Sequence, residues 1–110
     1  MTNRLIAAGV FVAASVIPAA AQDLKAKGEK LFVDQKCTLC HSVAGKGNVK
    51  GPLDGVGSKD SEADIRSWIT DAPGMTAKTG AARKPAMKQF TLEKADVDAL
   101  VAYVSSLKKK

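Results

Sequence analysis

The two cysteines of the chain and its single histidine fall within five residues, Cys37-Thr38-Leu39-Cys40-His41. Two thiols can add across the two vinyl groups of haem to form thioether bonds, and an imidazole can bind the iron. On a helical turn, residues three and four apart share one face, so Cys37, Cys40 and His41 can reach one flat macrocycle. The pattern C-x-x-C-H therefore predicts the attachment site of a covalently bound haem c.

Three other uses of these residues are possible. A C-x-x-C dithiol with redox activity is expected beside a βαβ pattern, and the sequence shows no such pattern. A structural zinc site usually takes four Cys and His ligands, whereas the chain holds two Cys and one His. A disulfide between Cys37 and Cys40 would leave His41 without a role, so haem attachment accounts best for all three residues.

Residues 1–21 are predicted to be a secretory signal peptide. Arg4 precedes the apolar run of residues 5–17, and Ala19-Ala20-Ala21 provide small residues for cleavage before Gln22. The alternative is a membrane anchor, but the stretch from Leu5 to Ala21 is at the lower limit of the roughly 17–25 residues that a spanning helix needs. We therefore expect a periplasmic protein without stable membrane insertion.

Removal of 21 residues from 110 leaves 89, which is one small domain, residues 22–110. A covalently held haem would help to stabilise a domain with so small a core. Without Arg4 the charge is +5, from 16 Lys and Arg against 11 Asp and Glu. No basic block alternates with aromatic residues, which argues against a nucleic-acid partner. The lysines are either an ordinary solvated surface or a face that steers an acidic redox partner.

The helical pattern predicts three helices and no strands. The first covers residues 24–34 with Asp23 as its N-cap. The second covers residues 61–71, with Ser61 as N-cap and Asp64 three residues later. Residues 72–83 contain proline and glycine without periodicity, and we expect a loop there. Thr91 is the expected N-cap of the last helix, whose apolar stripe is Val97, Leu100, Val101, Val104 and Leu107.

Residues 22–110 resemble the class I c-type cytochromes, which are small monohaem electron carriers. Four blocks occur in the family's order. They are Gly28-x-x-x-Phe32, the C-x-x-C-H motif, Gly51-Pro52-Leu53-x-Gly55, and Met87-x-x-Phe90 before a helix with Leu100-Val101-Ala102-Tyr103-Val104. The resemblance implies an all-α small cytochrome c fold. In it the N- and C-terminal helices cross, one shorter helix lies between them, and loops wrap round the haem.

The resemblance also implies roles for individual residues. His41 would be the proximal iron ligand, and the Pro52 carbonyl would accept a hydrogen bond from its other nitrogen. Trp68 would donate to a haem propionate, although a plain core aromatic is the alternative. Met87 would be the sixth ligand, but Lys88 follows it where many family members have proline. Met75 therefore stays an alternative ligand, and a lysine, a water or an open sixth site are further alternatives.

Gly28 and Phe32 are expected to meet Leu100 and Tyr103 where the terminal helices cross. The function implied is an exported monomeric carrier of one electron on a single haem c, not an enzyme. It would exchange electrons with redox proteins that have an acidic docking face. Two alternatives stay open, namely a haem-based binder or sensor of small ligands and a dedicated electron-transfer subunit of a dehydrogenase.

Overall fold

A computed structural model of the protein describes Gly9 and residues 19–110. Residues 1–8 and 10–18, most of the predicted signal peptide, lie outside the described residues, so the cleavage site and the domain boundary stay predictions. Among the helices of residues 19–110, none is long and apolar enough to cross a membrane.

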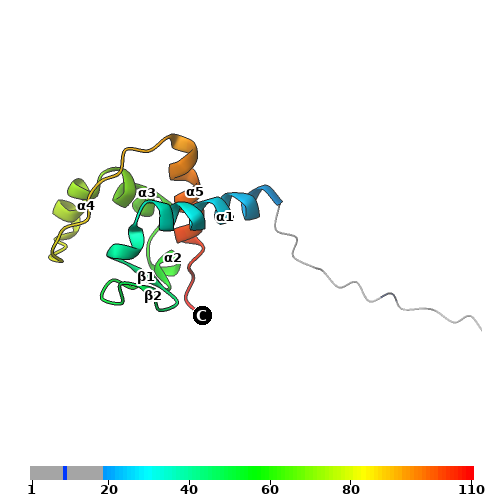
Figure 1. Cartoon of the computed structure of the whole chain (residues 1–110), viewed down its shortest axis with the longest axis horizontal. Helices are drawn as coiled ribbons and strands as arrows, with labels where there is room; N and C mark the ends of the chain where they lie inside the picture. Colours follow the sequence, from blue (N-terminus) through cyan, green and yellow to red (C-terminus); the bar gives the residue numbers. More distant parts are fainter. Residues whose placement is uncertain (1–8, 10–18) are drawn as a thin grey trace, which may run out of the picture.

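The described part is predominantly helical (Figure 1), which confirms the predicted fold class. The elements in chain order are α1 (Ala19–Asp34), the 3-10 turn η1 (Cys37–Leu39), β1 (Ser42–Val43), β2 (Lys46–Gly47), α2 (Val56–Lys59), α3 (Glu62–Thr70), α4 (Ala72–Thr79) and α5 (Lys94–Ser105). The antiparallel pair β1 and β2 was not predicted, since two-residue strands are too short to show an alternating pattern.

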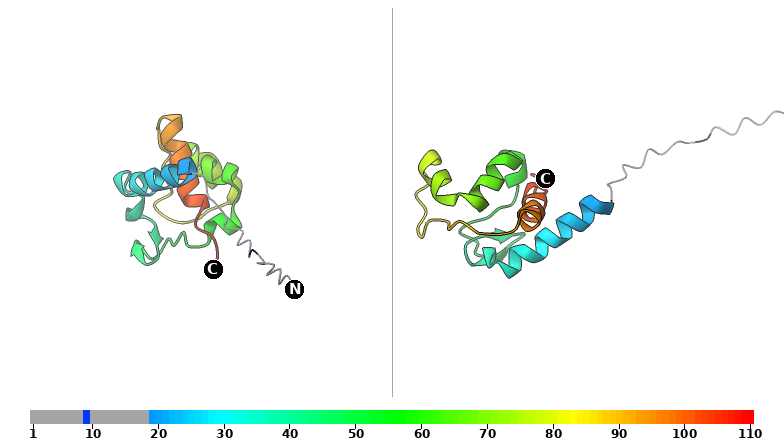
Figure 2. Two further views of the ribbon diagram at one scale, coloured as in Figure 1. Left: turned by 90° about the vertical axis from the view of Figure 1, so that its right-hand side faces the viewer. Right: turned by 90° about the horizontal axis from the view of Figure 1, so that it is seen from above.

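Helices α1 and α5 cross, and the views of Figure 2 show α5 lying across α1. Gly28 makes the close approach possible, because a Cβ at this position would collide with the carbonyl of Ala99 and lie 2.7 Å from Cβ of Tyr103. The rings of Phe32 and Tyr103 pack edge to face, with centroids 5.5 Å apart. The predicted helix crossing is confirmed.

Helix α1 begins five residues before the predicted start, and the prediction of Asp23 as its N-cap is wrong. The five residues that extend it are three alanines, the strongest helix formers, followed by Gln22 and Asp23. The helix therefore runs through the predicted cleavage position without a break.

Helix α3 confirms the predicted cap, since the Ser61 hydroxyl accepts a hydrogen bond from the Asp64 N–H at 3.1 Å. The predicted loop after it is wrong, because residues 72–79 form α4. Asp71 caps α4 by accepting from the Gly74 N–H at 3.2 Å, and Gly80 ends it with φ of 68°. Proline in the first turn and glycine after the last are typical helix boundaries, which the sequence pattern alone did not separate from a loop.

Helix α5 begins at Lys94 with Glu93 as N-cap, so the prediction for Thr91 is wrong. The predicted apolar stripe is buried except for Leu107, which is partly buried beyond the end of the helix. From there the chain turns across α2. The Gly57 N–H donates to the Leu107 carbonyl at 2.9 Å, and Lys108 Nζ donates to the Gly57 carbonyl at 2.7 Å.

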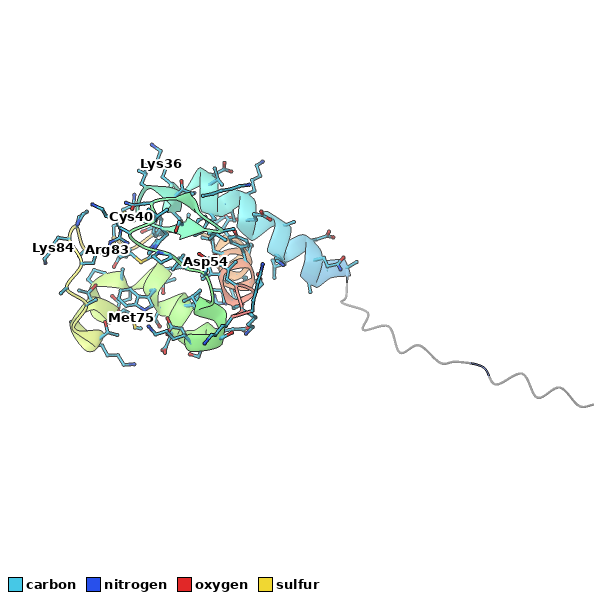
Figure 3. All side chains as sticks on the ribbon, turned by 90° about the horizontal axis from the view of Figure 1, so that it is seen from below. Lys36, Cys40, Asp54, Met75, Arg83 and Lys84 are labelled. Carbon is cyan, nitrogen blue, oxygen red and sulfur yellow. The ribbon has the colours of Figure 1, made fainter. Side chains whose placement is uncertain are left out.

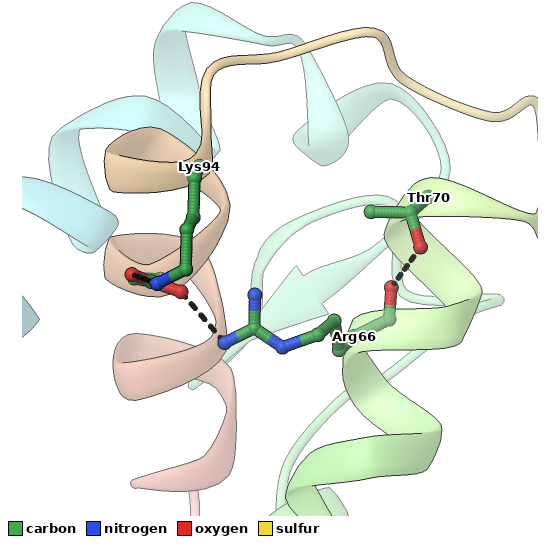
Figure 4. Close-up of polar contacts among 4 residues, drawn as sticks. Arg66, Thr70 and Lys94 are labelled. Atoms are coloured by element: carbon green, nitrogen blue, oxygen red, sulfur yellow. Dashed lines mark hydrogen bonds and ion pairs between the residues drawn. The ribbon is translucent and has the colours of Figure 1, made fainter.

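Asp98 connects α3 to α5 (Figure 4), because its carboxylate accepts from Arg66 and from Lys94, each at 2.7 Å. The hydrogen bond from Lys94, followed by that from Arg66, lowers the pKa of Asp98 below its usual value. Both partners are solvent-accessible, so salt weakens this cluster.

We expect Gly28→Ala to destabilise the haem-loaded protein by about 1–3 kcal/mol, since the added methyl overpacks a backbone contact that cannot rotate away. Denaturant unfolding would measure the loss. Glu29→Ala, an exposed change on the same helix, is the control and should stay within about 0.5 kcal/mol of wild type. A Gly28→Ala protein as stable as wild type would contradict the close crossing.

We expect Asp98→Asn to lower the thermal midpoint at pH 7. A carboxylate whose folded pKa is lowered stabilises the fold above its unfolded pKa and loses that effect as the pH falls through the folded value. The difference between variant and wild type should therefore shrink in acid and also in high salt. A difference that is constant from pH 7 to pH 2 would contradict an electrostatic origin.

Candidate functional site

A cavity of about 560 Å³ lies among α1, α3, α5, the turn at Cys37–Leu39 and the segment before α5. This volume is within the roughly 300–1,000 Å³ that is usual for cofactor sites. Its walls are mostly apolar. The apolar side chains that line it include Phe32, Leu53, Val56, Ile65, Trp68, Ile69, Phe90, Leu100 and Val104.

The structure brings Cys37, Cys40 and His41 together at the wall of this cavity. Lys36 adopts a left-handed conformation with φ of 60°, which ends the run of α1 and starts the turn η1. Within the turn, the N–H groups of Cys40 and His41 both donate to the Cys37 carbonyl, at 3.2 and 2.9 Å. One tight turn thus presents all three side chains to the same space, as their spacing predicts.

The His41 ring is held by the Gly51 carbonyl, to which its Nδ1–H donates at 3.1 Å. The prediction that Pro52 supplies this carbonyl is wrong by one residue. Ser42 and Pro52 form a parallel bridge, in which Gly51 O accepts from the Ser42 N–H and the Leu53 N–H donates to Ser42 O. Because successive carbonyls alternate along an extended chain, the Gly51 carbonyl faces this bridge and the Pro52 carbonyl does not.

The hydrogen bond from Nδ1 assigns the tautomer of His41 and leaves Nε2 as the nitrogen able to bind a metal. Burial lowers the pKa of His41. The Gly51 carbonyl opposes this shift, and the positive charge of Arg83 adds to it. The imidazole is therefore favoured in its neutral form, which is the form that coordinates metals.

Burial raises the pKa of the Cys37 thiol to about 11. Its backbone hydrogen bond and the charge of Lys88 oppose the shift, and Cys40 adds slightly to it. Cys37 is half-buried and Cys40 is exposed at the mouth of the cavity. The deeper of the two sulfurs is thus in an environment suited to a neutral, covalently bound group.

The two methionines of the described residues differ in position. Met87 is half-buried and lines the cavity together with His41. Met75, labelled in Figure 3, is only 7 % exposed, lies on α4 and is absent from the cavity lining. Met75 therefore fills space within the fold, while Met87 is the thioether within the cavity.

Trp68 is half-buried on α3 and lines the cavity, so either predicted role is compatible with its position. The polar part of the lining includes residues that the sequence analysis did not single out, namely Asn48, Lys50, Asp60, Arg83 and Lys84. Arg83 and Lys84 lie at the same end of the molecule as Cys40 (Figure 3). No local pattern could have identified them, because they come from an irregular segment that only the fold brings to the cavity.

The residues present fit a haem c. The cavity offers two thiols for the vinyl groups, an imidazole nitrogen and a thioether for the iron, and apolar walls for the macrocycle. Within the described part of the chain, no cluster of three or more His, Cys, Asp or Glu residues could hold a metal ion by itself.

The model of the family described as Cytochrome c matches residues 25–108, which is more than half of the chain. No curated protein and no solved structure matches the chain. The matched region begins within α1 and includes the C-x-x-C-H motif, Met87 and all of α5. The chain therefore belongs to the cytochrome c family, whose members carry covalently bound haem c and transfer electrons.

Proposed function

We propose that the protein is a soluble, exported carrier of one electron on a single haem c. Cys37 and Cys40 would form the thioether bonds, and His41 and Met87 would bind the iron. The observation that carries this proposal is that one cavity holds His41 and Met87, two residues 46 positions apart. The presence of one C-x-x-C-H motif supports a count of one haem.

Haem c supplies a reversible Fe(III)/Fe(II) couple when bound. His41 would offer Nε2, since Nδ1 donates to Gly51, and the fixed ring needs little movement between redox states. A thioether from Met87 raises the reduction potential relative to a second imidazole. The apolar walls act in the same direction because they disfavour the more highly charged ferric form. If His41 and Met87 both bound the iron, no position on it would be left for a substrate, which supports a carrier over an enzyme.

Positive charge gathers where the cavity opens. Lys50, Arg83 and Lys84 line the cavity, and Figure 3 shows Lys36 near Cys40 at this end. Two exposed apolar side chains lie in the same region, Leu39 at 69 % and Val49 at 68 % exposed. The Asn48 side chain donates to the Leu39 carbonyl at 3.1 Å, which holds the two loops together. We infer that an acidic redox protein docks on this end, and that the protein works as a monomer in the periplasm.

Substitution of the methionines tests the ligand assignment. We expect Met87→Leu to convert the ferric haem from low spin to high spin and to let the ferrous form bind CO readily, because the thioether is lost. Met75→Leu, the matched control, should keep a low-spin spectrum that is indifferent to CO. Visible absorption spectra of both variants, matured with covalent haem, would measure this. Ready CO binding by the wild type would instead favour the ligand sensor.

The rate of oxidation by a small anionic oxidant, measured at several ionic strengths, tests the role of the positively charged end. Oxidation of the ferrous protein by ferricyanide should slow as salt is added, since screening removes the attraction. We expect Lys36→Glu and Lys50→Glu to lower the rate at low salt and to flatten the salt dependence. Lys25→Glu on α1, twelve residues before Cys37, should do so less. Equal effects of all three substitutions on the rate would indicate that only the net charge of the protein matters, not the position of the lysines.

A further inference from the structure

Residues 80–93, which we call the Met87 loop, connect α4 to α5 and contain neither helix nor strand. Five consecutive residues of this loop, 83–87, line the cavity. Residues 81–86 are all exposed, and the Phe90 N–H donates to the Ile69 carbonyl at 2.8 Å beyond them. Because few backbone hydrogen bonds hold such a segment, its side-chain contacts decide how firmly Met87 stays at the cavity.

Arg83 lines the cavity and also packs against Gly51. A Cβ added to Gly51 would collide with Nη1 of Arg83 and with the Cys40 carbonyl, and would lie 2.9 Å from Cζ of Arg83. The guanidinium group therefore packs on the backbone of Gly51, beside Cys40. Figure 3 shows Arg83 and Cys40 next to each other. Only a residue without a side chain leaves room for this packing.

Gly51 is also the residue that holds His41, through its carbonyl at 3.1 Å from Nδ1. Arg83 is four residues before Met87 in the chain. One side chain thus joins the loop that carries Met87 to the backbone that orients His41. The positive charge of Arg83 contributes to the lowered pKa of His41, which agrees with this proximity. A planar guanidinium can lie flat on a peptide and donate to neighbouring carbonyls, which a lysine ammonium cannot do in the same way.

We propose that Arg83 is a positioning residue that latches the Met87 loop onto Gly51 and so limits how often the sixth iron position opens to outside ligands. The inference rests on the proposed ligation by Met87 and deepens it. In this proposal, the exposed residue Arg83 closes the side of the cavity from which a small molecule would enter and displace the Met87 thioether. Electron transfer would leave this latch closed, whereas ligand entry would require it to open.

The test is the rate of cyanide binding to the haem-loaded ferric protein at saturating cyanide, where opening of the loop limits the rate. Arg83→Ala should bind cyanide roughly fivefold faster, because the packing of the guanidinium group on Gly51 is lost from the closed state. Arg83→Lys should also bind faster, because it keeps the charge and loses the packing of the guanidinium group on Gly51. Lys84→Ala, which removes a neighbouring cation from the same wall, should stay within about twofold of wild type.

A double variant adds a second measure of the same contact. Gly51→Ala should also accelerate cyanide binding, and Arg83→Ala combined with Gly51→Ala should be no faster than the faster single variant. Equal rates for Arg83→Ala and Lys84→Ala, or full rescue by Arg83→Lys, would overturn the latch. The sulfur-to-iron absorption band of the ferric wild type separates the two proposals. Its absence would overturn Met87 ligation and the latch together, while its presence with unchanged rates would overturn the latch alone.

Discussion

The close contact between α1 and α5 at Gly28 determines where the walls of the cavity stand. Because Gly28 has no side chain, the backbone of Ala99 can approach it directly, and the Phe32–Tyr103 pair fixes the angle beside it. Phe32 on one helix and Leu100 and Val104 on the other then face the cavity. The attachment turn begins three residues after α1 ends, so the position of α1 also sets the position of the two thiols.

A second constraint holds the segment that runs from the turn η1 to the strand β2. The hairpin of β1 and β2 folds back on the turn, and the Asn48 N–H donates to the carbonyls of Thr38 and His41 at 3.0 and 3.1 Å. Gly47, with φ of 107°, approaches the same two carbonyls so closely that a side chain there would collide with the His41 oxygen. Backbone contacts rather than apolar packing therefore hold the segment that carries the proposed haem ligands. This gives the His41 ring one orientation before any metal is considered.

The sequence predicted those features that depend on local pattern. The C-x-x-C-H motif, the Ser61 cap and the apolar stripe of α5 each express their chemistry over a few residues, and the structure places them as expected. Features that depend on the fold were missed or misplaced. Pro73 and Gly80 could mark a loop or the ends of a helix, and the caps that Asp71 forms decide between them. Pro52 was predicted in place of Gly51 as the partner of His41, because the sequence does not show in which direction a carbonyl points. The role of Arg83 depends on its contact with Gly51, which is 32 residues away in the chain.

The contacts of the C-terminal residues with α2 have a consequence for the order of assembly. Leu107, Lys108 and Lys109 bind Gly57 and Ser58 through three hydrogen bonds, and the neighbouring Val56 is part of the cavity wall. A chain that emerges N-terminus first exposes Cys37 and Cys40 long before Lys108 exists to reach Gly57. The contacts that complete the wall at α2 therefore form after both cysteines are already in the chain. Until then the two thiols lie beside a cavity whose wall at α2 is incomplete.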